Sequence, residues 1–125
     1  MIAGRGTYLA ELQTQIDMEG VGDIVQLAGF VPDDELRLML QRTSCVVIPS
    51  LYEPFGIVAL EALAAEAPVV AAAAGGMAEV LEGTGAGLLV PPGDAGSLSF
   101  AVERLLTEPV LAASSQAAGN RLVEE

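Results

Sequence analysis

The sequence predicts an α/β fold, a Rossmann-like parallel sheet with helices on both faces. Short runs rich in β-branched residues alternate with longer stretches of amphipathic helical period, which is the order of repeated βαβ units. The chain is also strongly apolar, with 52% hydrophobic and 18% charged residues, as expected for strands buried on both faces. Its 125 residues fit one domain of ordinary size, so we expect a single domain over residues 1–125.

Five apolar runs are too short for helices and are predicted to be strands. They are Met1–Ala3, Ile24–Ala28, Cys45–Ile48, Val69–Ala72 and Gly87–Val90. A chain that opens inside a strand is expected to lack the first strand-helix unit of a doubly wound domain, through trimming or as a natural fragment. Ligands of such domains lie beyond the carboxyl ends of the strands, so the site is expected in the turns that follow these runs.

Helical periodicity predicts helices between the strands and two more at the end of the chain. The first predicted helix lies at about Tyr8–Met18. The second begins after a cap at Asp33 or Asp34, and its Leu36, Met39 and Leu40 are expected to face inward. The others lie from near Phe55, at Met77–Leu81, at about Ala95–Leu106 with Asp94 as cap, and at about Val110–Leu122.

Charge and residue types exclude several functions. The net charge is −12 and all five cationic side chains are arginines, so a nucleic-acid backbone would be repelled. The chain has no histidine, which removes the commonest metal ligand and general base, and we expect no metal or other cofactor. Cys45 sits in an apolar run, where it is expected to be a small buried residue and not a catalytic thiol.

The first residues and the apolar runs indicate the compartment. The start of the chain has neither the basic segment nor the apolar run of a secretory signal. Uncharged runs such as Ala67–Met77 are far shorter than the roughly 20 residues that span a bilayer. We therefore expect a cytoplasmic protein.

The segment Pro49–Glu61 runs from a predicted strand end through a short loop into an apolar helix. The first turn of a helix has unpaired amides, here at about Gly56–Val58, and the helix dipole adds partial positive charge there. Gly56 has no side chain to hinder an approaching anion. These features predict a phosphate site at the start of the helix.

Two carboxylates flank the same turn, Glu53 in the loop and Glu61 eight residues later in the helix. A carboxylate is only an acceptor, so each suits a pair of sugar hydroxyls better than a phosphate. The residues alone leave an alternative open, in which Glu53 caps the loop and Glu61 faces solvent. For the binding role we expect Glu61 to be partly buried and to face a ribose held over Gly56.

Three further turns at strand ends carry candidate residues. Gly75-Gly76 opens a helix, and its amides would reach the same ligand, although glycine is also ordinary in such a turn. Phe30, followed by Val31, would lie against a base, the alternative being a core phenylalanine. Arg5 would face a diphosphate, the alternative being a solvated turn residue.

Five motifs in the chain resemble those of the group 1 glycosyl transferases, in the same order and over nearly the whole chain. They are GFVPDDEL (Gly29–Leu36), PSLYEPFGIVALEALA (Pro49–Ala64), PVVA (Pro68–Ala71), GGMAEV (Gly75–Val80) and GLLVPPGD (Gly87–Asp94). The resemblance, which extends to glycogen synthases and sucrose synthases, implies the C-terminal lobe of a GT-B glycosyltransferase without its first strand-helix unit. In that fold two Rossmann-like lobes hold a nucleotide-sugar in the cleft between them.

The resemblance also implies roles for single residues. Glu53 would lie near the transferred sugar as the catalytic residue, and Glu61 would hold the ribose hydroxyls. Together with the turns above, the expected donor-binding residues are Glu61, Phe55, Gly56, Ile57, Val58, Phe30, Val31, Gly75, Gly76 and Arg5. The chain departs from the family at Glu66, where glycine is common, and at Ala78, where proline is common. The acceptor lobe and an early arginine-lysine pair that clamps the diphosphate have no counterpart in the chain.

We therefore expect the donor-binding domain of a retaining glycosyltransferase that transfers a hexose from a nucleoside diphosphate sugar to an acceptor. The expected partners are the donor and a missing N-terminal acceptor lobe. Peripheral membrane association of the full-length enzyme and self-association of the fragment are further expectations. The alternative is a truncated or degenerate lobe that acts as a non-catalytic binding or assembly module. A receiver-like domain is disfavoured, because its acidic strand ends are replaced here by glycine, proline and Glu53.

Overall fold

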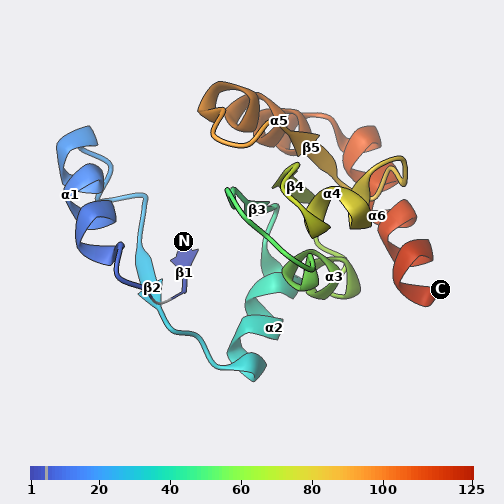
Figure 1. Ribbon diagram of the computed structural model, residues 1–125, viewed down its shortest axis with the longest axis horizontal. Helices are drawn as coiled ribbons and strands as arrows, with labels where there is room; N and C mark the ends of the chain where they lie inside the picture. The colour runs from blue at the N-terminus through green and yellow to red at the C-terminus, as the bar shows by residue number, and fades with distance from the viewer. Residues whose placement is uncertain (5) are drawn as a thin grey trace. The chain divides into compact units, whose positions relative to one another are not determined.

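The computed structural model describes residues 1–4 and 6–125, which form two compact units, Met1–Leu36 and Arg37–Glu125. Each unit contains a parallel sheet (Figure 1). Parallel strands joined by helices confirm the predicted α/β class. The prediction of one domain over residues 1–125 stays a prediction.

The first unit contains a two-stranded parallel sheet. Strand β1 (Ile2–Ala3) pairs with β2 (Leu27–Gly29), and helix α1 (Leu9–Glu19) connects them. The second strand begins later than predicted, because the amides of Ile24 and Val25 both donate to the carbonyl of Val21 and so form a turn.

Helix α2 (Asp33–Arg42) begins one position earlier than a cap at Asp33 would require. The amide of Leu36 donates to the carbonyl of Pro32, so Pro32 occupies the capping position and the prediction of an aspartate cap is wrong. Asp33 and Asp34 lie in the first helical turn, where their charge favours the helix dipole.

The second unit is built on a three-stranded parallel sheet of order β3 (Val46–Ile48), β4 (Val69–Ala72), β5 (Leu88–Val90). The central strand β4 is buried along its whole length. Its side chains alternate between two core clusters, with Val69 and Ala71 in one and Val70 in the other. The sheet therefore has a packed layer on each face, as an uninterrupted apolar strand requires.

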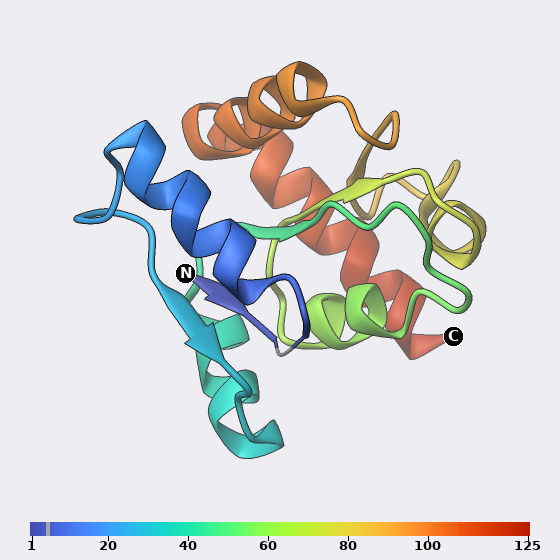
Figure 2. The same cartoon turned by 60° about the vertical axis from the view of Figure 1, so that its left-hand side comes forward.

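Helices form both layers. Helix α5 (Ala95–Thr107) packs on the Val70 side, and α3 (Ile57–Ala64) and α4 (Gly76–Leu81) pack on the other side (Figure 1). Helix α6 (Pro109–Glu124) contacts both α5 and α3, and Figure 2 shows it running from one to the other. All predicted helices of this unit are thus confirmed, with ends shifted by one to a few residues.

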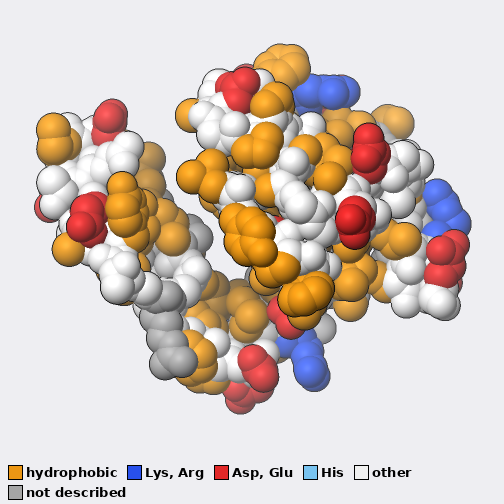
Figure 3. Space-filling model, in the orientation of Figure 1, with side chains coloured by type: hydrophobic (Ala, Val, Ile, Leu, Met, Phe, Trp, Pro, Cys, Tyr) orange, Lys and Arg blue, Asp and Glu red, His pale blue; other side chains and the backbone are white. Residues whose placement is uncertain are grey.

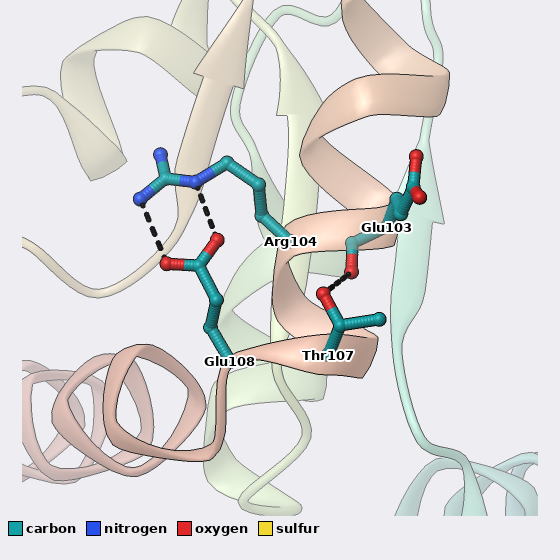
Figure 4. A network of polar contacts seen from close by, with 4 residues as sticks. All are labelled: Glu103, Arg104, Thr107 and Glu108. Carbon is teal, nitrogen blue, oxygen red and sulfur yellow. Dashed lines mark hydrogen bonds and ion pairs between the residues drawn. The ribbon is translucent and has the colours of Figure 1, made fainter.

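Polar contacts fix the ends of α5. The Asp94 carboxylate accepts from the Ser97 amide at 2.9 Å, which confirms the predicted cap. At the other end Arg104 pairs with Glu108 at 2.9 Å and the Thr107 hydroxyl donates to the Glu103 carbonyl (Figure 4). These groups are exposed, so they shape the junction of α5 and α6 and not the core. In the described part of the chain, no helix combines the length and apolarity needed to cross a membrane.

Candidate functional site

The turn between β3 and α3 contains most of the predicted site. Gly56 precedes the helix with φ 69, a left-handed conformation that glycine adopts without strain. Helix α3 then buries Ala59, Ala62 and Leu63 against the sheet and α6. Packing of this face fixes the helix axis and with it the direction of the amides of the first turn, at Ile57 and Val58.

The Glu53 side chain folds back onto this turn. Its Oε1 accepts from the amide of Phe55 at 3.3 Å and from the amide of Gly56 at 3.1 Å. Glu53 is half-buried and caps the loop, which confirms the structural alternative drawn from the sequence. The expectation that the Gly56 amide is unpaired is therefore wrong. One oxygen holds both amides, and a carboxylate has acceptor positions for further donors such as hydroxyls. Capping and sugar binding are therefore compatible.

Gly75 and Gly76, which lead into α4, pack directly on the same turn. The Gly76 amide donates to the Glu53 carbonyl at 2.7 Å. A methyl group added at Gly75 would lie 2.6 Å from the Glu53 carbonyl oxygen, and one at Gly76 would lie 2.7 Å from the Phe55 amide nitrogen. Both distances are shorter than side chains tolerate. The structure thus gives these glycines a packing role, while the predicted contact with a donor stays a prediction.

Gly56 completes this contact between the two turns. A methyl group at Gly56 would lie 3.0 Å from the Gly76 carbonyl oxygen and 3.0 Å from the Val80 side chain. The contact of Val80 with this turn was not predicted, because the sequence shows only an apolar residue in a short helix at that position. Glu53, Phe55, Gly56, Gly75 and Gly76 are therefore brought together as one assembly.

Glu61 lies one helical turn after Ile57, and residues four apart share a helix face. The prediction that Glu61 is partly buried is wrong, because its side chain is exposed. Its neighbours Ala62 and Leu63 take the buried positions, which leaves Glu61 on the outer face of α3. Its role toward a ribose stays a prediction.

A run of large apolar side chains is exposed around this turn. In Figure 3 hydrophobic side chains gather in the middle of the second unit, where Figure 1 shows β3 and the chain after it. The exposed members of this run are Leu51, Tyr52, Phe55, Ile57, Val58 and Leu60. Contiguous exposed apolar surface of this kind is typical of binding surfaces. Self-association of the fragment stays a prediction that this surface supports.

The predicted base-binding residues lie in the first unit. Phe30 is 63% exposed, which contradicts its alternative placement in the core, and Val31 is half-buried. The role of Phe30 and Val31 at a base stays a prediction. Arg5, the predicted diphosphate contact, lies outside the described residues.

A small cavity of about 180 Å³ opens beside the carboxyl ends of β3, β4 and β5. It lies in the turns after the strands, where the sequence predicted a site, but none of its lining residues was singled out as a binding residue. The lining residues are Pro49, Ala72, Val90, Pro91, Gly93, Asp94, Ala95 and Leu98. The cavity is mainly apolar, and its position agrees with the expectation that ligands of such domains lie beyond the strand ends.

Cys45 precedes β3 and is half-buried, and desolvation raises the pKa of its thiol. A raised pKa disfavours the nucleophilic thiolate. Within residues 1–4 and 6–125, no group of three or more acidic or cysteine side chains is arranged to hold a metal ion. The expectation of a reaction without metal stays a prediction.

Comparison with known proteins decides the family. Residues 1–121 match the sequence profile of the family described as Glycosyl transferases group 1. This chain belongs to the group 1 glycosyl transferases. Among its relatives, the glycogen synthase of Mycobacterium tuberculosis is 37% identical over 125 residues, which cover 99% of this chain and 30% of the relative.

Solved structures show the same fold for this group 1 glycosyl transferase chain. Sucrose-phosphate synthase from Thermosynechococcus elongatus superposes with a TM-score of 0.87 at 34% identity, covering 95% of this chain and 30% of that one. Anabaena HepE in complex with UDP-glucose gives a TM-score of 0.82 at 30% identity, and the match covers 97% of this chain and 35% of the HepE chain. The chain thus spans about a third of these proteins and has the fold of a GT-B C-terminal lobe, as the sequence predicted.

Proposed function

We propose that this chain forms the donor-binding part of a retaining glycosyltransferase that transfers a hexose from a nucleoside diphosphate sugar to an acceptor. The observation that carries the proposal is the assembly at the start of α3, where Glu53 is held by the amides of Phe55 and Gly56. The complex of the Anabaena relative with UDP-glucose supports the class of donor.

In this proposal the chain binds and orients the donor. The Glu53 carboxylate accepts hydrogen bonds from hydroxyls of the sugar, and Glu61 accepts from the ribose. The amides of Ile57 and Val58, with the helix dipole behind them, stabilise negative charge that develops on the departing diphosphate. Such a site works by positioning and electrostatics, so it needs neither a histidine base nor a metal.

We expect the acceptor and the second wall of the cleft to belong to an N-terminal lobe, since the chain spans about a third of its relatives. We expect the isolated chain to bind donor weakly and to lack turnover, because catalysis requires both walls of the cleft. The cytoplasmic location, and peripheral membrane association of the full-length enzyme, remain proposals for the whole protein.

The test is a titration of UDP and UDP-glucose into the chain and its Glu61→Ala variant. Hydrogen bonds to a charged group contribute about 1.5–3 kcal/mol each before desolvation, so loss of Glu61 should weaken UDP binding several-fold or more. The matched control is Glu82→Ala, since Glu82 is also an exposed glutamate, at the end of α4. Equal affinities of the two variants would contradict the assigned role of Glu61, and no binding by the unaltered chain would contradict donor binding.

A further inference from the structure

Glu53 is held at two points, one on its side chain and one on its backbone. Its carboxylate accepts from the amides of Phe55 and Gly56, and its carbonyl accepts from the amide of Gly76 at 2.7 Å. Gly76 is the first residue of α4 and is buried. The bond therefore ties the loop after β3 to the start of a different helix.

The Gly76 position is also closed to any side chain. A methyl group there would lie 2.7 Å from both the Cα and the amide nitrogen of Phe55, and these are backbone atoms that cannot rotate away. Gly76 is not among the glycines with positive φ, so its backbone conformation does not by itself require glycine. The requirement comes from the approach of the Pro54 carbonyl oxygen and of the Phe55 backbone.

We infer that Gly76 is a positioning residue for the donor site and acts through Glu53. By bonding the Glu53 carbonyl and admitting the Phe55 backbone, Gly76 sets the turn in which one carboxylate oxygen reaches both amides. Hydrogen bonds weaken steeply as distance and angle depart from the optimum, so a small displacement of this turn releases the carboxylate. The consequence for ligand binding rests on the proposed function, whereas the effect on Glu53 does not.

Amide hydrogen exchange of the 125-residue chain, followed by NMR, tests the effect on Glu53 without any ligand. In Gly76→Ala we expect exchange at Phe55 and Gly56 to accelerate at least tenfold, as in Glu53→Ala. Exchange at Leu63, inside α3, should stay close to that of the unaltered chain. The matched control is Gly96→Ala, because Gly96 lies in the first turn of α5, where an added methyl group comes no closer than 3.6 Å to another atom.

Unchanged exchange at Phe55 and Gly56 in Gly76→Ala would overturn the inference. If this variant fails to fold, replacement of Gly76 by glycolic acid removes the N–H without adding a methyl group. The same acceleration at the two amides is expected there, and its absence would equally overturn the inference.

A double-mutant cycle with UDP-glucose distinguishes positioning from general destabilisation. Gly76→Ala should weaken binding several-fold in the unaltered chain and by less than twofold when Glu53 is already alanine, since residues that act through one another are not additive. Additive losses would overturn the inference. If the unaltered chain binds no UDP-glucose, the proposed function fails, and hydrogen exchange still decides whether Gly76 positions Glu53.

Discussion

Replacement of Glu66 by glycine should stabilise the chain. Within residues 1–4 and 6–125, Glu66 is the one non-glycine residue with positive φ, at 62°. It follows the end of α3, where its amide donates to the Leu63 carbonyl and the amide of Ala67 donates to the Ala62 carbonyl. These paired bonds form a Schellman motif, whose left-handed position is usually glycine.

The size of the effect follows from opposing terms. An L side chain in the left-handed region costs about 1–2 kcal/mol, which glycine removes. Glycine also makes the unfolded chain more flexible, and this entropy lowers the free energy of unfolding by about 0.4–1 kcal/mol. The contact of Asn120 with the Glu66 carboxylate, 3.4 Å long and exposed, is lost. The bond from Gln116 to the Glu66 carbonyl involves the backbone and survives. The net gain of Glu66→Gly is therefore roughly 0.5 kcal/mol.

Comparison of glycine with alanine isolates the backbone term, because both variants lose the carboxylate. Glycine at position 66 should exceed alanine by about 0.5–1 kcal/mol in urea unfolding followed by circular dichroism. The control pair is Glu103→Gly and Glu103→Ala within α5, where alanine should be better by about 1 kcal/mol. If the Glu66→Ala variant is as stable as the Glu66→Gly variant, the assignment of strain to Glu66 is refuted.

Two further predictions concern buried and capping groups. Hydrogen bonds from the Ser97 amide and hydroxyl lower the pKa of Asp94 from 3.8, so its charged cap stabilises the fold above that pH and is lost as the pH falls through the lowered pKa. Asp94→Asn should therefore lose less stability between about pH 5 and about pH 3 than the unaltered chain, and an equal loss in urea unfolding would contradict this. Ser115 is 2% exposed and donates to the Ala86 carbonyl at 3.0 Å. Ser115→Ala should cost about 1–3 kcal/mol in thermal or urea unfolding, whereas the exposed control Ser114→Ala should change little; equal effects would speak against a structural role for this bond.

The order of helices and strands could be predicted because the apolar pattern is strong in each segment. In β4, four consecutive buried residues make a run that fits a strand covered on both faces. The error at Ile24 arose because apolar residues in a turn look like the start of a strand when the hydrogen bonds to Val21 are unknown. Local pattern therefore predicts the elements well and their ends less well.

That the turn before α3 and the Gly75-Gly76 turn lie together could also be predicted, but not the direction of their side chains. Glu53 and Glu61 have the same chemistry, and the sequence left both a binding and a structural interpretation open for each. Glu53 turns back to the amides of Phe55 and Gly56, whereas Glu61 extends from the outer face of α3. The difference depends on which backbone groups lie within reach, and that is a property of the folded turn.

Glycine shows why the sequence could not say how the site is built. Gly56 needs glycine for its left-handed backbone, whereas Gly76 has an ordinary backbone and needs glycine because Phe55 lies against it. Glu66 is the reverse case, since its backbone favours glycine and the chain has a side chain there instead. One letter in the sequence thus stands for two physical requirements. They can be separated by substitution, because a methyl group at Gly76 disturbs a neighbouring turn while one at position 66 strains only its own backbone.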